Sequence, residues 1–145
     1  MRRSLFLAFC CASGMLWSQG VPPPNAGDLK SPRVFAPDDG KVRTMANGGK
    51  SRDVLRGALL TGEPVNVHES VQQPGTTPNA MHTIAHSEFI LVREGTLLYE
   101  HDGMAERAET GSLIYVPQGT LHTVRNAGGS AAKYVVIAMG GDAAK

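Results

Sequence analysis

The sequence predicts an all-β sandwich or barrel built from short antiparallel strands. The 145-residue chain has 17 glycines and 9 prolines but an aromatic content of only 6%, a balance that favours short strands joined by tight turns over a helical bundle. Short apolar runs recur at close spacing between Asp53 and Met139, and no helical period separates them. We therefore expect one β domain, which also suits the length of the chain.

The expected strands follow one another with turn residues between them. Val65, Val67 and Val71 alternate with polar neighbours, as in a strand with one buried face. His68 is out of phase with these valines, which predicts a surface or partly buried structural role. Asp102-Gly103 is a strong signal for a two-residue hairpin turn. The expected strands cover residues 64–71, two runs within 88–103 that break at Glu94-Gly95, and residues 104–109, 112–117, 121–126 and 133–139.

The first twenty residues have the features of a signal peptide. MRRSLFLAFCCASGMLWSQG begins with two arginines after Met1 and continues with an apolar run that is too short to span a bilayer comfortably. Ser18-Gln19-Gly20 offers small residues for cleavage, just before a VPPP segment that cannot continue a helix. We expect residues 1–20 to be removed and the mature chain to be exported, periplasmic or secreted, with no membrane span.

Removal of this segment changes what the rest of the chain contains. Cys10 and Cys11 both lie in it, so the mature chain is expected to have no disulfide. The segment also takes two of the 14 basic residues and none of the 13 acidic ones, which leaves the mature chain close to neutral. Because the chain has no basic run or aromatic–basic stripe, we expect no nucleic-acid partner.

Composition divides the remaining chain into an arm, a domain and a tail. Residues 21–52 are rich in proline and turn residues, and only SPRVFAP and KVRTM within them suit short edge strands. We expect this arm to carry no chemistry. The domain is expected over residues 53–140, and residues 141–145 form a C-terminal tail.

Residues able to bind a metal ion cluster in the segment AMHTIAHSEF. His82, His86 and Glu88 share one parity, so they project to the same face if this stretch is extended. Imidazole nitrogens and a carboxylate oxygen suit a divalent first-row metal, whereas the same groups without partners are costly to bury in a dry core. The alternative is that all three side chains face solvent.

The segment GSLIYVPQGTLHTVRN resembles the second sequence motif of the cupin family, G(x)5PxG(x)2H(x)3N. Every fixed position of that motif is matched, by Gly111, Pro117, Gly119, His122 and Asn126. The resemblance covers roughly residues 53–139. It implies a double-stranded β-helix, the jelly-roll barrel of cupins.

The first cupin motif, G(x)5HxH(x)3–4E(x)6G, is matched in part. Glu88 and Gly95 have the spacing of its last two positions, and His82 precedes Glu88 by six residues, as the first histidine of the motif does with the shorter spacer. Ile84 occupies the position of the second histidine. The chain therefore departs from the family pattern at one ligand position.

The resemblance implies a metal site inside the barrel, with His82, Glu88 and His122 as ligands. In cupins the Pro-x-Gly turn brings the histidine of the second motif beside the ligands of the first. His86 is a candidate for the fourth ligand, or alternatively for an acid–base or substrate contact in the cavity. The implied cofactor is a divalent transition metal ion, for which Mn, Fe, Zn, Ni and Cu are all possible. Asn126 and the glycines and proline of the motifs match structural positions.

The other polar and aromatic residues are expected to be structural. His101 adjoins the Asp102-Gly103 turn and should be exposed. Arg93 and Arg125 flank the motifs and are expected at solvated edges, the alternative being that they face a bound anion. The tyrosines expected in the core or at its rim are Tyr99, Tyr115 and Tyr134.

Three kinds of function fit this sequence. The first is a metal-dependent enzyme acting on a small polar molecule, such as a dioxygenase, isomerase or decarboxylase, because three or four protein ligands leave coordination positions open. The second is a non-catalytic module that binds a metal or small ligand. The third is a jelly roll whose site has been lost, as Ile84 would indicate.

A modest core without disulfides, together with unpaired strands at the sheet edges, predicts a homodimer, as the cupin resemblance also does.

Overall fold

The computed structural model of the protein describes residues 26–145, so the expected signal peptide lies outside the described residues. These residues form ten strands and no helix. The strands are β1 (Ala26–Asp28), β2 (Val42–Thr44), β3 (Lys50–Ala58), β4 (Pro64–Gln72), β5 (Ser87–Glu94), β6 (Thr96–His101), β7 (Met104–Glu109), β8 (Leu113–Val116), β9 (His122–Asn126) and β10 (Ala132–Met139).

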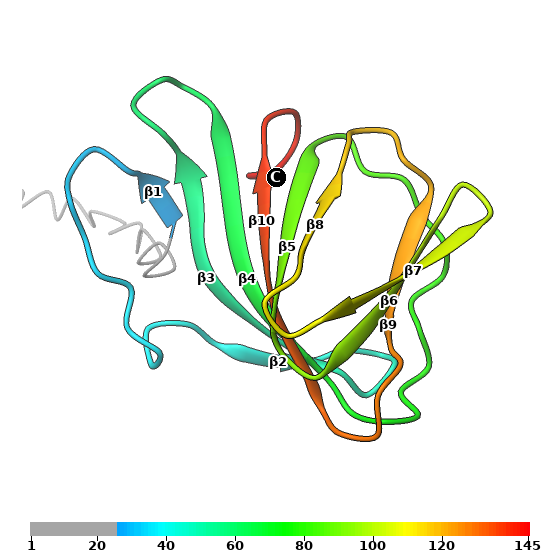
Figure 1. The fold of residues 1–145 in the computed structure, drawn as a ribbon. Helices are drawn as coiled ribbons and strands as arrows, with labels where there is room; N and C mark the ends of the chain where they lie inside the picture. Colours follow the sequence, from blue (N-terminus) through cyan, green and yellow to red (C-terminus); the bar gives the residue numbers. More distant parts are fainter. Residues whose placement is uncertain (1–25) are drawn as a thin grey trace, which may run out of the picture.

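The strands form two sheets that face each other (Figure 1). The larger has seven strands in the order β1-β3-β4-β10-β5-β8, with β2 also paired to β3, and the smaller has the order β7-β6-β9. All the pairs are antiparallel except β1 with β3. This is the jelly-roll architecture, and the prediction of an all-β fold is confirmed.

The core lies between the two sheets. Its largest fully buried side chains are Ile90 and Val92 from β5, Leu97 from β6 and Val116 from β8. Because side chains alternate along a strand, the β5 pair projects from one face of the large sheet towards the small one. Burial of such side chains stabilises the fold by about 1.5–3 kcal/mol each.

Most of the strands expected from the sequence are present. The predicted segment 64–71 becomes β4, and the break at Glu94-Gly95 separates β5 from β6. Asp102 and Gly103 both have positive φ, at 46° and 77°, as a type I′ hairpin turn requires. Of the two possible edge strands in the arm, KVRTM contains β2, whereas the described structure has no strand in SPRVFAP.

Strand β3 was not expected from the sequence, and its irregular pairing explains why. The register between β3 and β4 shifts between Asp53 and Leu55, as at a β-bulge. A bulge interrupts the two-residue alternation on which the recognition of a strand depends. Strand β3 begins at Lys50 and pairs with β2, so the hairpin of these two strands crosses the boundary expected between residues 52 and 53.

On β4 the polar side chain of His68 faces the inside of the barrel, whereas Val67 faces the outside. His68 pairs with Val136, which pairs in turn with the core residue Ile90, so His68 lies on the inner face of the large sheet. Val67 pairs with Ile137 on the other face. His68 is thus opposite in phase to the valines, as expected, but it points into the barrel, and the surface role considered for it is wrong.

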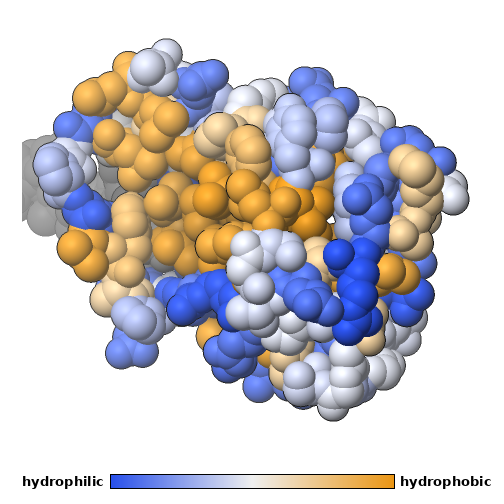
Figure 2. Space-filling model, viewed as in Figure 1, coloured by the Kyte–Doolittle hydropathy of each residue, from blue (hydrophilic) through white to orange (hydrophobic). Residues whose placement is uncertain are grey.

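The outward-facing side of the large sheet is apolar. Figure 2 shows a broad hydrophobic area over the strands that Figure 1 labels β4, β10, β5 and β8. Leu113 is 60% exposed there and Tyr115 is 54% exposed. We call this surface the outer face; its residues are Val67, Phe89, Leu91, Leu113, Tyr115, Val135, Ile137 and Met139.

Candidate functional site

The turn before β9 delivers His122 to a second histidine. Gly119 adopts a positive φ of 84° and donates its backbone N–H to the carbonyl of Ile84 at 2.9 Å. His122 then donates its backbone N–H to the His82 carbonyl at 2.9 Å, and His82 returns the bond at 3.0 Å. This antiparallel bridge places the two histidines directly opposite each other.

The two imidazoles are held in the same way, each by a contact of Nδ1 with the backbone carbonyl two residues earlier. Their ring centroids are 4.8 Å apart. Nδ1 of His82 lies 3.1 Å from the Ala80 carbonyl oxygen, and Nδ1 of His122 lies 3.0 Å from that of Thr120. Because a carbonyl only accepts, Nδ1 is the donor in each ring, and in a neutral imidazole with this tautomer Nε2 keeps a lone pair. Neither Nε2 has a hydrogen-bond partner within residues 26–145.

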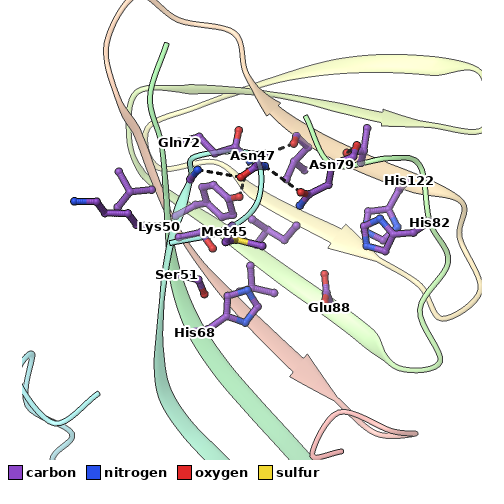
Figure 3. A pocket seen from close by; sticks show the side chains of 18 residues that line it. Met45, Asn47, Lys50, Ser51, His68, Gln72, Asn79, His82, Glu88 and His122 are labelled. Carbon is purple, nitrogen blue, oxygen red and sulfur yellow. Dashed lines mark hydrogen bonds between the residues drawn. The ribbon is translucent and has the colours of Figure 1, made fainter. Parts of the chain in front are cut away.

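Both histidines and Glu88 line one cavity of about 160 Å³ between the sheets. His122 is only 3% exposed. Glu88 stands on the inner face of β5, where it pairs with Ala138 on one side and Val116 on the other. In Figure 3 its carboxylate lies between His68 and the pair formed by His82 and His122. Three of the four expected ligands therefore face the same space.

His86 is held outside this cavity, between two carboxylates. Its Nε2 lies 3.0 Å from Glu88 Oε1, and its Nδ1 lies 2.7 Å from Asp142 Oδ1. Burial opposes the charged form of His86, but the hydrogen bonds to Asp142 and Glu88 outweigh it and raise the pKa of the imidazole. The same hydrogen bond lowers the pKa of Asp142, because it stabilises the charged carboxylate. Both ring nitrogens are thus engaged, and His86 fixes the orientation of Glu88.

The segment before β5 is not extended, so His82 and His86 do not face the same space although an even number of residues separates them. His82 forms an isolated bridge, the strand starts only at Ser87, and a bend covers Ala85 and His86. Ile84 packs against the core cluster from the position of the missing motif histidine. Within residues 26–145, no three His, Cys, Asp or Glu side chains are gathered closely enough to hold a metal ion. The two free Nε2 atoms suit a cation, and Glu88 and His68 line the same cavity as further donors.

His68, for which a surface or partly buried structural role was expected, is partly buried and lines the cavity. It lines the same space as Glu88, and Figure 3 shows its ring directed towards that space. Burial lowers the pKa of His68, against the opposing influence of Glu88 and Asp53. A sequence signal for it exists, because Asn66, His68, Ser70 and Gln72 form an unbroken polar row at two-residue spacing. Such a row marks the wall of a polar cavity as well as it marks a solvent face.

The remaining candidates have structural or surface roles. His101 was expected to be exposed, but its side chain is only 13% exposed, because it stacks on Tyr99 with ring centroids 4.4 Å apart and contacts Glu106 and Asp102 at the hairpin tip. Asn126 binds the carbonyls of Gln72 and Ser130 at 2.9 and 2.8 Å through its side-chain amide, in agreement with a structural position. The flanking arginines form ion pairs, Arg93 with Glu69 and Arg125 with Glu100.

Solved structures share this fold at low sequence identity. A polyketide cyclase, RemF from Streptomyces resistomycificus, is 19% identical with a TM-score of 0.60, over 75% of this chain and 79% of its own. KdgF from Halomonas sp. is 14% identical with a TM-score of 0.62, over 74% of this chain and 94% of its own. An RmlC-like cupin from Shewanella frigidimarina is 14% identical with a TM-score of 0.61, over 77% and 94%. At these identities the likeness concerns the fold alone.

The fold and the motif together define a jelly-roll barrel of the cupin type. The family model described as "Cupin domain" matches residues 67–138, which contain both histidines of the bridge and Glu88. The chain belongs to the cupin family. No curated protein matches it in sequence. In the part of the chain that the structure describes, no helix is long and apolar enough to cross a membrane.

Proposed function

We propose that this cupin binds a divalent transition metal ion through His82, His122 and Glu88 and acts there on a small polar molecule. The observation that carries the proposal is the pair of imidazoles that face one cavity with both Nε2 lone pairs available. Backbone carbonyls hold each Nδ1–H, the arrangement that commonly orients metal-binding histidines. The metal can be Mn, Fe, Zn, Ni or Cu.

In this proposal His86 acts through Glu88 instead of serving as a fourth ligand. Its hydrogen bond to Glu88 Oε1 holds one carboxylate oxygen, so Glu88 Oε2 is the atom available to the cation. A bound divalent ion would supply Lewis-acid polarisation of a substrate oxygen. His68, on the opposite wall, has a lowered pKa owing to burial, and its neutral ring can accept a proton from a bound molecule.

A non-catalytic binding role is the second candidate. It is favoured by the finding that no three donor side chains are already gathered within residues 26–145 and by Ile84 in a ligand position. A protein of this kind would hold its ligand or metal without turnover.

We further propose that the chain is exported after cleavage near Gly20 and forms a homodimer. Mass spectrometry of the N-terminus of the purified protein tests the cleavage, and an intact residue 1–20 segment contradicts it.

Metal analysis of the purified protein tests the site. After incubation with Co²⁺ or Zn²⁺ and removal of excess ion, we expect about one metal per chain in the wild type, in line with a single site. His122→Ala should lose this metal, because it removes one of the two free imidazole nitrogens. His101→Ala is the matched control, since His101 contacts carboxylates at a hairpin tip and should retain full loading.

The same measurement distinguishes ligands from orienting residues. His86→Ala should still bind metal but about 10–100-fold more weakly, the usual effect of losing a residue that orients a ligand. Binding should also weaken in acid, because the ligands must be deprotonated. Full metal loading in His122→Ala, or equal loss in His101→Ala, contradicts the proposal.

A further inference from the structure

A second cavity, of about 410 Å³, adjoins the one that contains Glu88. The two cavities share Met45, Ser51 and His68 as lining residues. The additional wall comes from β2, β3 and β4 and carries Arg43, Arg56 and Asn66. The second cavity therefore extends the space around His68 towards a wall that bears two guanidinium groups.

Asn66 brings an unsatisfied polar group to this cavity. Its Oδ1 is buried and has no hydrogen-bond partner, and it is the single buried side-chain atom in that state among residues 26–145. Buried side-chain oxygens in native proteins nearly always accept a hydrogen bond from the protein, water or a ligand. Because Asn66 lines the cavity, a molecule in the cavity that carries an O–H or N–H group can supply the missing donor.

The charges around the second cavity favour an anion. Arg43 is paired with Asp53 at 2.8 Å, so these two charges offset each other. Arg56 is half-buried and donates one bond, from Nη1 to the main-chain oxygen of Lys145 at 2.7 Å. Its other N–H groups have no partner in the described part of the chain. A guanidinium with unused donors is well suited to a carboxylate.

The sheet register places the cation and the amide side by side. Arg56 is the cross-strand partner of Asn66, and Asp53 is that of His68 on the same face. Directly paired residues have Cβ atoms about 4.5–5.5 Å apart. A ligand that contacts Arg56 and Asn66 at once must therefore carry its acidic group and its donor close together. The rest of such a ligand continues past His68 towards Glu88.

We propose that the second cavity binds a small hydroxy acid, with its carboxylate on Arg56 and a neighbouring hydroxyl donating to Asn66 Oδ1. This inference deepens the proposed function, since it names the class of small polar molecule that would reach the metal-binding end. It rests on the proposed function only for the statement that the bound acid reaches the metal-binding end of the cavity. Binding of the acid itself requires Arg56 and Asn66 and no metal.

Calorimetric titration of the metal-free protein, with chelator present, tests this subsite with three probes. Gluconate carries both the carboxylate and the hydroxyls, sorbitol carries only hydroxyls, and hexanoate carries only the carboxylate. We expect gluconate to bind about ten-fold or more tightly than either of the others, because it makes both the charge-assisted bond and the bond to Asn66. Equal binding of gluconate and sorbitol, or no saturable gluconate binding, overturns the proposal.

Variants assign the two contacts. Arg56→Gln should weaken gluconate binding about ten-fold and leave sorbitol unchanged, whereas Asn66→Leu should bring gluconate down to the level of hexanoate. Arg107→Gln is the matched control, since Arg107 pairs with Glu109 on β7 and lines neither cavity. Thermal unfolding confirms that each variant is folded. Unchanged gluconate binding in Arg56→Gln overturns the assignment.

His122→Ala separates this inference from the metal site. The variant should lose metal and keep gluconate binding, because His122 does not line the second cavity. If wild-type protein binds gluconate but no metal, the metal proposal fails and the subsite stands. If it binds metal but no hydroxy acid, the subsite fails alone.

Discussion

The inner and outer faces of the large sheet differ in a way that the alternation of polar and apolar residues does not predict by itself. Along β4, the inner positions are Asn66, His68, Ser70 and Gln72, and Val67 faces outward. Along β5, by contrast, the inner positions include the apolar core residues Ile90 and Val92. The interior of the barrel thus contains both an apolar core and a polar cavity, and Ile90 borders both. Valine periodicity identifies a strand, but it does not identify its buried face.

The largest expected effect concerns the packed part of the barrel. Leu97 has no exposed surface between the sheets, so Leu97→Ala should lower the free energy of unfolding by about 2–5 kcal/mol through lost burial and a residual cavity. Leu113→Ala on the outer face should change it by less than about 0.5 kcal/mol when measured on dilute protein. Denaturant titration compares the two. Equal losses would show that the outer face is buried within the single chain.

The outer face itself is expected to be covered by a second copy of the chain. Its apolar residues lie on adjacent strands, and exposed apolar surfaces of this kind mark association sites. Leu91→Lys should weaken the dimer about ten-fold or more, because it places a charge within the interface. Light scattering at micromolar concentration measures the mass. Met104→Lys, at the exposed tip of the β6–β7 hairpin, should keep the dimer mass, and a wild-type monomer contradicts the prediction.

The smallest expected effect is a change in the pH dependence of stability. Burial lowers the pKa of His68 below the ordinary value of 6.5, so the unfolded chain binds the proton first as pH falls. Stability should therefore decrease with falling pH from about 6.5 down to the folded-state pKa, by at most about 1.4 kcal/mol per pH unit for one proton. His68→Asn should remove this part of the slope. Unfolding titrations at several pH values check it, and an unchanged slope shows that His68 is not the group responsible.

The features that were predictable from the sequence are turns defined by a few neighbouring residues. The second motif has turn formers at fixed positions, and such local chemistry defines the geometry of the Gly119 turn and the position of His122. The hairpin at Asp102-Gly103 was predictable for the same reason. These features depend on a few neighbouring residues only.

The features that could not be predicted depend on contacts between distant segments. His86 has the parity of His82, but the bend before β5 and the contact with Asp142 direct its ring away from the cavity. The strand β3 is concealed by its bulge, and the inner position of His68 depends on pairing with β10. Residues 141–145 were taken as a tail, yet Asp142 contacts His86 and Ala143 is buried.

The bridge between His82 and His122 has a consequence for the order of events during maturation. Its two backbone hydrogen bonds join segments that lie far apart in the sequence, so they form only when the small sheet closes onto the segment before β5. The paired imidazoles consequently do not exist in a partly folded chain. At the proposed metal site, uptake would then follow folding instead of nucleating it, and a freshly synthesised chain would remain metal-free until the barrel has closed.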